Sequence, residues 1–308
     1  MRLVTVPFLF AAMLAGVIST AAAATIRDDR SESRYTSLAA AAAYSGVGEL
    51  SNYGASTLGS GSLVSSEWVL TAAHVVSGAG NASNLRFEVN GTTYYGDSYT
   101  VYSGYDRRTY SGDMALVHLS QAVMGVAPAT VYAGATSDLL GQTATYVGYG
   151  LTGTGLTGCT GGNGAKRAVQ NVLDMLGSSS SGRWASTDLI SDFDSPARAV
   201  NRLGQSTALD LEGCVAPGDS GGGVFVTLNG MTYLAGVNSL LSCDDGSLNA
   251  SYGDYSVCVS VADYAGWIAG VVDSSSPKGI AAVATPEPST FCLLAVGGLV
   301  VGVWRRRR

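Results

Sequence analysis

The most restrictive feature of this sequence is a long series of short β-strand patterns separated by glycine, serine, asparagine and aspartate. The series runs from Tyr44 to Trp267 and includes "GSLVSSEWVLTAA", "NLRFEVNG", "DMALVHL", "TATYVGYG" and "GGVFVTL". Apolar runs between turn residues predict strands, and many in succession predict a sandwich or a barrel. With 41 glycines and 46% apolar residues, the chain of 308 residues has the turns and the apolar material for a large all-β core.

Helical periodicity is scarce, and both ends of the chain have the composition of targeting segments. The clearest helical pattern is "VADYAGWIAGVV", which predicts a short helix that closes the domain near residue 272. At the N-terminus, an apolar run followed by four alanines predicts a cleavable signal peptide, with cleavage after Ala23 or Ala24. We therefore divide the chain into a signal peptide (1–24), an N-terminal segment (25–43), the β domain (44–272), a linker (273–285) and a C-terminal tail (286–308).

The C-terminal tail combines "PEP", an apolar run from Phe291 to Trp304 and four terminal arginines. As a helix, 14 residues rise only about 21 Å, which is short for a bilayer core of about 30 Å. The arrangement resembles the PEP-CTERM sorting signal of Gram-negative bacteria. That resemblance implies export past signal peptidase, handling by an exosortase-type enzyme, a short apolar helix with transient membrane association, and a final location in the cell envelope or outside the cell.

The charge balance disfavours nucleic acid as a partner. Without Arg2 and the four terminal arginines, 12 basic residues remain against 23 acidic ones, so the exported part is clearly anionic. This part also contains four of the five cysteines, Cys159, Cys214, Cys243 and Cys258. Export permits disulfides, and the lack of C-x2-C spacing favours two bridges over a zinc site.

A serine nucleophile with a histidine base is the chemistry that the sequence points to. "GDSGGG" surrounds Ser220 with glycines, which permit a tight turn that exposes the hydroxyl. The chain has two histidines, His74 and His118, and both precede Ser220. This order excludes the nucleophile elbow of α/β-hydrolases, where the histidine follows, and the lack of a suitable aspartate before His74 disfavours a subtilisin order. The order histidine, aspartate, serine remains.

The three sequence blocks resemble the trypsin-like, chymotrypsin-clan serine proteases. "WVLTAAHVV" contains His74, "SGDMALVHL" contains Asp113 and "APGDSGGGVF" contains Ser220. The resemblance covers about residues 44–270 and implies two six-stranded β-barrels with the active site in the cleft between them. It also implies that Ser220 attacks a peptide carbonyl, that His74 is the base, that Asp113 orients His74, and that the amides of Gly218 and Ser220 form the oxyanion hole. His118 lies a strand's length from Asp113 and is the weaker base.

Two features around this triad stay open at the level of sequence: the partner of Asp219 and the pairing of the cysteines. The resemblance implies that Asp219 pairs with a newly formed N-terminal amine. Ile26, the terminus left by signal removal and an internal partner are the alternatives. Gly59 and Val75 occupy the positions where the family often has a disulfide, so that bridge is not expected. The four cysteines fit Cys214–Cys243 with Cys159–Cys258, or Cys214–Cys258 with Cys159–Cys243.

The resemblance also implies a specificity pocket whose floor lies a few residues before the serine, but "EGCVAPGDS" can be aligned with the family with or without a two-residue gap. One alignment places Glu212 at the floor of the specificity pocket, which favours Arg or Lys, and the other places Cys214 there, which favours apolar or small side chains. Ser239, Leu240 and Leu241 fall on the substrate-lining strand, and the two leucines narrow the entrance. We expect a restricted, apolar preference.

Neither a cofactor nor a metal ion is predicted. "GYGLTG" continues as a glycine-rich loop rather than the helix of a dinucleotide site, and "CDDGSLNASYGD" lacks EF-hand spacing. The favoured hypothesis is an exported serine endopeptidase acting on a protein or peptide. The alternatives are an inactive relative that serves as a binding or matrix protein, and an esterase, because ester and amide cleavage share acyl-enzyme chemistry.

Overall fold

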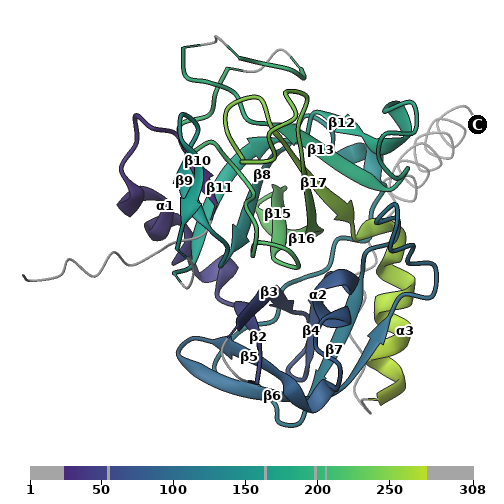
Figure 1. The fold of residues 1–308 in the computed structure, drawn as a ribbon. Coiled ribbons are helices and arrows are strands. Elements are labelled where there is room, and N and C mark those ends of the chain that lie inside the picture. Colours follow the sequence, from purple (N-terminus) through teal and green to yellow (C-terminus); the bar gives the residue numbers. More distant parts are fainter. Residues whose placement is uncertain (1–23, 54–55, 163–164, 198–199, 205–206, 276–308) are drawn as a thin grey trace, which may run out of the picture.

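The protein is built mainly of β-strands in two units, which lie one above the other in Figure 1. A computed structural model describes residues 24–53, 56–162, 165–197, 200–204 and 207–275. The predicted signal peptide up to Ala23 and the predicted sorting tail lie outside the described residues, as does the linker beyond Ser275. Within the described part, the all-β class is confirmed.

The first unit is a closed six-stranded barrel with strand order β2-β3-β4-β7-β6-β5. Leu50, Leu70, Phe87 and Leu116 are fully buried inside it, as the alternation of apolar residues in these strands predicts. β4 and β7 pair antiparallel, so the end of one strand lies beside the start of the other. The barrel strands are β2 (Val47–Asn52), β3 (Ser56–Leu63), β4 (Trp68–Thr71), β5 (Leu85–Val89), β6 (Thr92–Val101) and β7 (Ala115–Leu119).

The second unit is a curved seven-stranded sheet with order β11-β8-β15-β16-β17-β13-β12. Its buried side contains Tyr146, Val169, Leu189 and Val259. A small four-stranded sheet, β10-β9-β1-β14, lies beside it. The remaining strands are β1 (Thr25–Ile26), β8 (Thr143–Gly148), β9 (Thr152–Thr154), β10 (Gly158–Gly161), β11 (Arg167–Val172), β12 (Met175–Leu176), β13 (Asp188–Asp192), β14 (Gly213–Cys214), β15 (Gly223–Leu228), β16 (Met231–Ser242) and β17 (Tyr255–Ser260).

The expected two-barrel fold is confirmed, but the second barrel has seven strands and is not closed. Its outer strands β11 and β12 follow one another along the chain, but no continuous ladder joins β11 to β13. Individual hydrogen bonds join these two parts of the chain instead. The Asn171 side chain donates to the Asp192 carbonyl (2.6 Å), and the Asp174 amide donates to the Ile190 carbonyl (2.9 Å). The chain leaves its pairing with β8 after Val172 and pairs with β13 from Met175 onward. The second unit is therefore a half-barrel.

The segment 25–43 belongs to the folded body. β1 pairs with β14, and helix α1 (Glu32–Ala39) packs against β11 (Figure 1). Tyr35 of α1 is fully buried and its hydroxyl donates to the carbonyl of Glu212 (3.1 Å). Ion pairs from Arg30 and Arg34 to Asp210 add contacts at the surface. The N-terminal segment therefore holds the backbone just before the Ser220 loop.

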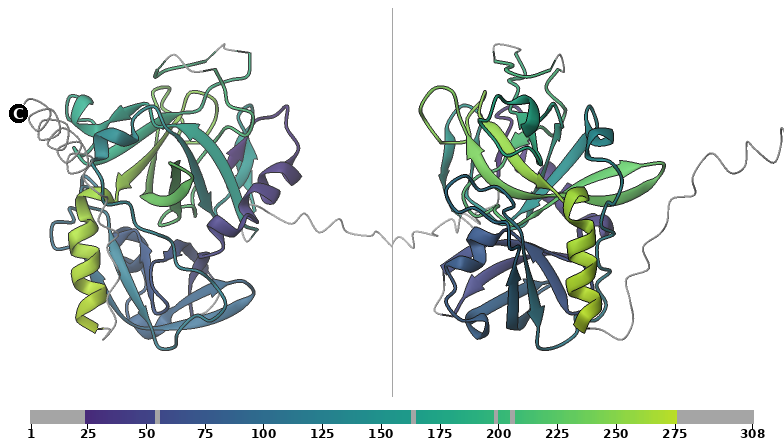
Figure 2. Two further views of the ribbon diagram at one scale, coloured as in Figure 1. Left: turned by 180° about the vertical axis from the view of Figure 1, so that it is seen from behind. Right: turned by 90° about the vertical axis from the view of Figure 1, so that its right-hand side faces the viewer.

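The predicted C-terminal helix is confirmed as α3 (Ala265–Ser275), which lies along the first barrel (Figure 2). Tyr102 packs edge-on against Tyr264 and Trp267, with ring centroids 4.9 and 5.5 Å apart. In the part of the chain that the structure describes, no helix is both long and apolar enough to cross a membrane. The other short helices are α2 (Ala73–Ser77) and the 3-10 turns η1 (Ala42–Tyr44), η2 (Ala82–Asn84), η3 (Thr136–Leu139), η4 (Gly177–Ser179) and η5 (Ala262–Tyr264).

Candidate active site

His74 and Asp113 meet because they sit on neighbouring strand ends of the first barrel. His74 follows β4 in helix α2, Asp113 precedes β7, and the ladder between these strands ends at Thr71 opposite Ala115. The Nδ1 atom of His74 lies 2.7 Å from Oδ2 of Asp113, and the His74 amide donates to Oδ1 (2.9 Å). Asp113 is fully buried, whereas the His74 side chain is 25% exposed. This pairing fixes the tautomer that leaves Nε2 free to accept a proton.

Ser239 completes the hydrogen bonding of the buried carboxylate. Its hydroxyl donates to Oδ2 of Asp113 (2.6 Å) from strand β16 of the second unit. The sequence suggested Ser239 as a substrate-binding residue, and it does line the pocket described below. Its hydroxyl, however, is committed to Asp113. The contact links the two units at the candidate site.

Ser220 lies in a tight turn between β14 and β15 that packs against the first barrel. Gly221 has φ +82°, and a Cβ atom there would lie 2.1 Å from the Thr71 hydroxyl, so this position requires glycine. The Ser220 carbonyl accepts a hydrogen bond from the Ser60 amide (2.7 Å). A Cβ atom on Gly59 would lie 2.5 Å from that carbonyl and 2.9 Å from Val75. Gly59 of β3 therefore lies close both to the Ser220 turn and to the helix that carries His74.

The amides of Gly218 and Ser220 are available for an oxyanion. Gly218 has φ +98°, a backbone conformation that residues with a side chain rarely adopt. Its carbonyl is held by the Ser60 hydroxyl (3.1 Å). Among the described residues, neither amide has a hydrogen-bond acceptor, although the amides of Asp219, Gly221 and Gly222 all do. Two free N–H groups in one turn are what an oxyanion hole requires.

Asp219 is buried beneath this turn and accepts three backbone hydrogen bonds. Its Oδ1 accepts from Gly150 (2.9 Å), and its Oδ2 accepts from Ala216 (2.8 Å) and from Ala24 (3.1 Å). Burial raises the pKa of this carboxyl to about 6, against the effect of these bonds. Of the N-terminal residues that the sequence suggested, it is Ala24 rather than Ile26 that contacts Asp219, because Ile26 lies in β1 opposite Gly213.

The sequence did not single out Arg167, although it is buried next to Ala24 in this region. Its side chain is only 1% exposed, and its guanidinium forms an ion pair with Glu32 (2.9 Å) and donates to the Ala24 carbonyl. Burial lowers the pKa of Arg167, while the charges of Glu32 and Asp219 counter that effect. An arginine at the start of the apolar strand "RAVQNV" was the available signal.

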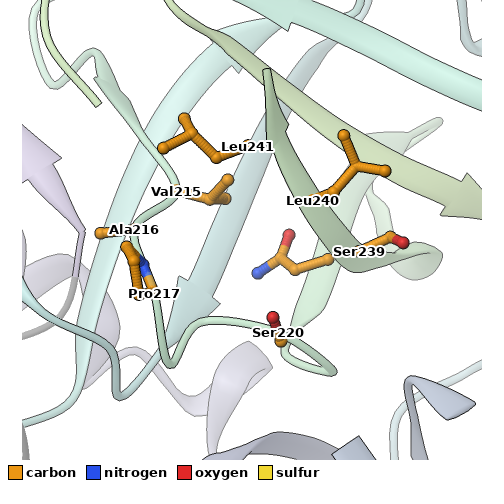
Figure 3. A pocket seen from close by; sticks show the side chains of 8 residues that line it. Val215, Ala216, Pro217, Ser220, Ser239, Leu240 and Leu241 are labelled. Carbon is orange, nitrogen blue, oxygen red and sulfur yellow. The ribbon is translucent and has the colours of Figure 1, made fainter. Parts of the chain in front are cut away.

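A pocket of about 190 Å³ opens beside Ser220, with residues 215–217 on one wall and 239–241 on the other (Figure 3). Leu240 and Leu241 line it as the sequence suggested, but Glu212 does not. Both oxygens of Glu212 instead accept backbone amides, from Asp194 (2.6 Å) and Leu209, and burial raises the pKa of this residue to about 8. The pocket therefore lacks a carboxylate among its described lining residues: Val215, Ala216, Pro217, Ser220, Asn238, Ser239, Leu240 and Leu241.

Cys214 precedes the pocket wall and is fully buried, so it supports the wall rather than lining it. The hydroxyl of Ser256 donates to its sulfur (3.3 Å). The predicted disulfides are not present: all four cysteines of the described chain carry free thiols. Cys214 and Cys258 lie on separate strands, β14 and β17. The Cys258 thiol contacts the Leu189 carbonyl (3.6 Å).

The other candidate groups lie away from this chemistry. His118 pairs through Nδ1 with Asp97 (2.7 Å) and packs on Trp68, at the far end of β7 from Asp113. Cys243, Asp245 and Asp254 place a thiol and two carboxylates within 4.8 Å of one another. Three such donors are fewer than the four ligands of a structural zinc site, and Asp254 already accepts the Ser251 amide (3.1 Å).

Comparison with known proteins gives two family matches. The family model described as Trypsin matches residues 38–268, and the one described as PEP-CTERM protein-sorting motif matches residues 284–308. The chain is also similar to brachyurin of Leptuca pugilator, with 37% identity over 99 residues. That alignment covers 30% of this chain and 44% of brachyurin, so the chain spans less than half of the length of this curated relative. The first match contains all three candidate catalytic residues.

Proposed function

Because this chain belongs to the trypsin family of serine endopeptidases, we propose that it hydrolyses peptide bonds with His74, Asp113 and Ser220 as its catalytic triad. The observation that carries the proposal is the buried Asp113 carboxylate, which receives His74 Nδ1 at 2.7 Å and the Ser239 hydroxyl at 2.6 Å. A buried carboxylate with these partners stabilises the imidazolium that forms when His74 takes a proton.

Each residue has one role in the proposed reaction. His74 removes the proton of the Ser220 hydroxyl as its oxygen attacks the substrate carbonyl, and the free amides of Gly218 and Ser220 stabilise the oxyanion. His74 then gives its proton to the leaving amine, and an acyl-enzyme on Ser220 remains. Water attacks this ester with His74 again as the base. Asp113 orients the imidazole throughout and keeps its own charge.

The test is labelling by a fluorophosphonate probe together with cleavage of a peptide library. Wild-type protein should label and cleave, and Ser220→Ala should do neither while keeping the wild-type Tm. A folded wild type that never labels would favour the inactive binding protein. Labelling and ester cleavage without peptide cleavage would favour the esterase.

The pocket supports a small or medium apolar residue before the cleaved bond. Val215 and Leu241 stand on its two walls (Figure 3). The buried Cys214 thiol, which precedes Val215 in the sequence, offers no charge to receive Arg or Lys, because burial raises its pKa. Desolvating a cationic side chain without a partner carboxylate is unfavourable. A positional-scanning peptide library should show cleavage after Ala, Val or Leu, and efficient cleavage after Arg or Lys would refute this specificity.

The sorting motif places the proposed peptidase in an export route. The PEP-CTERM match at residues 284–308 indicates export to the cell envelope of a Gram-negative bacterium. We propose that signal peptidase removes the signal peptide, that the folded protease extends to about residue 272 and that an exosortase-type enzyme processes the tail after a linker. Its partners are then protein or peptide substrates rather than nucleic acid.

The contact between Ala24 and Asp219 favours cleavage after Ala23 over cleavage after Ala24. The Ala24 amide is buried and donates to Oδ2 of Asp219 (3.1 Å), so a new terminus at Ala24 would put its ammonium on this carboxylate. Signal removal itself would then complete the oxyanion turn. N-terminal sequencing of the exported active protein should give Ala24 as its first residue. An exported protein that starts at Thr25 and is fully active would contradict this.

A further inference from the structure

Tyr110 has an unusual backbone conformation directly beside the candidate base. Its φ angle is +58°, which L-residues adopt at a cost of about 1 kcal/mol. Asn90 and Asn229, which share a positive φ, each precede a glycine in a hairpin turn where asparagine is favoured. Tyr110 is the only aromatic residue among the described non-glycine residues with a positive φ. These residues are Ala24, Asn90, Tyr110, Ser181, Asn229 and Ala250.

The loop around Tyr110 is built to hold this conformation. Asp106 and Ser111 pair across the loop, with the Asp106 amide donating to the Ser111 carbonyl (2.9 Å). Asp106 also accepts the amide of Arg108 (2.8 Å). Gly112 turns the chain with φ +66° and lies against the Tyr102 ring, 2.9 Å from where a Cβ atom would be. Tyr110 is fixed on both sides, although it is itself 36% exposed and not part of a core.

The ring of Tyr110 contacts the imidazole of His74. The two ring centroids are 5.5 Å apart and the planes are at 76°, an edge arrangement that is attractive for aromatic pairs. Asp113 holds Nδ1 of His74, but no described hydrogen bond holds its Nε2 side. Strain that persists at such a place points to a function, because burial of the tyrosine does not account for it.

We propose that Tyr110 is a positioning residue that limits the His74 imidazole to the orientation in which Nε2 faces Ser220. The proposal rests on the proposed triad. The loop keeps the tyrosine in its strained conformation, and the tyrosine ring blocks rotation of the imidazole away from the nucleophile.

The test compares Tyr110→Phe, Tyr110→Gly and a matched control, Asn229→Gly. The control removes another positive-φ residue in a hairpin turn on the opposite unit, between β15 and β16. Glycine adopts a positive φ without strain, so both glycine variants should keep the wild-type Tm. We expect Tyr110→Gly to lower kcat and the rate of fluorophosphonate labelling about fivefold, with little change in KM. Tyr110→Phe and Asn229→Gly should match the wild type.

Proton NMR gives a readout that does not need activity, because the chain has two histidines, His74 and His118. Tyr110→Gly should broaden or shift the ring resonances of His74 and leave those of His118 unchanged. Unchanged His74 resonances and an unchanged labelling rate in Tyr110→Gly would overturn the proposal. A wild type that does not label, but whose His74 resonances respond to Tyr110→Gly, would contradict the proposed function and leave the role of Tyr110 supported.

Discussion

At the scale of single residues, the site depends on how completely the charge of Asp113 is satisfied. This carboxylate receives the ring and the amide of His74 and the hydroxyl of Ser239, and it has no exposure to water. Charge-assisted hydrogen bonds in such surroundings are stronger than neutral ones. Loss of any one donor leaves a buried negative charge less stabilised, and the orientation of His74 changes with it.

Ser239→Ala is therefore expected to reduce kcat about tenfold, since a hydrogen bond to a buried charge contributes about 1.5–3 kcal/mol, of which part affects the transition state. The preference for the residue in the pocket should not change, because the hydroxyl of Ser239 points to Asp113. Steady-state kinetics with two apolar substrates measure both quantities. Ser239→Thr, which keeps a hydroxyl, is the control, and an altered preference with an unchanged kcat would assign Ser239 to substrate binding.

At the scale of elements, the end of strand β16 is held by one arginine. The guanidinium of Arg183 lies over the rings of Trp184 and Tyr255, with distances of 4.4 and 4.9 Å to their centroids. Its nitrogens bind Asp244 (2.5 Å) and the Cys243 carbonyl (2.8 Å), just past the pocket wall. Leu240 of that wall packs into the same aromatic cluster. Arg183 thus fixes the strand along which a substrate would lie.

Arg183→Lys is expected to raise KM for extended peptides about fivefold, because a lysine cannot reproduce the planar fork of an arginine. Its ammonium would make fewer of the contacts with Asp244 and Cys243. The labelling rate with a small fluorophosphonate should stay at the wild-type level, since Ser220 and His74 are untouched. Equal losses in labelling and in peptide cleavage would mean that Arg183 supports the triad instead.

At the scale of the whole molecule, several buried carboxyl groups make stability depend on pH. Burial raises the pKa of Asp174 to about 8, of Asp188 to about 7 and of Glu212 to about 8. The carboxyl groups of Asp192 and Asp194 add to the effect on Asp174. Between about pH 4 and pH 8 these groups keep protons in the folded state that the unfolded chain loses.

The free energy of unfolding should therefore fall as the pH rises from about 4 to about 8. Urea titrations across this range measure the slope, and Asp174→Asn should make it shallower by one proton. Asp210→Asn is the control: two arginines lower the pKa of Asp210 to about 2, so its contribution is lost only below about pH 4. A slope that rises with pH would contradict this account of the buried acids.

The sequence by itself determined the fold class, the closing helix and the candidate triad. These depend on local patterns: alternating apolar residues specify strands, and the sequence blocks around His74, Asp113 and Ser220 identify these residues by their neighbours and their order. The choice between Glu212 and Cys214 could not be made locally, because it depends on which way the chain turns before Pro217. Only the tertiary structure placed Glu212 on backbone amides, opened the second barrel and left the cysteines unpaired.

Contacts between distant segments likewise required the tertiary structure. Ala24 and Asp219 are 195 residues apart, Tyr110 reaches His74 through a strained loop, and the buried Arg167 pairs with Glu32. Sequence patterns leave such pairs undecided, as they left three alternatives for Asp219, because burial and hydrogen bonding among remote segments are set by the packing of the whole chain. The chemistry of this protein can be read from its sequence, but the contacts that position that chemistry exist only in the folded molecule.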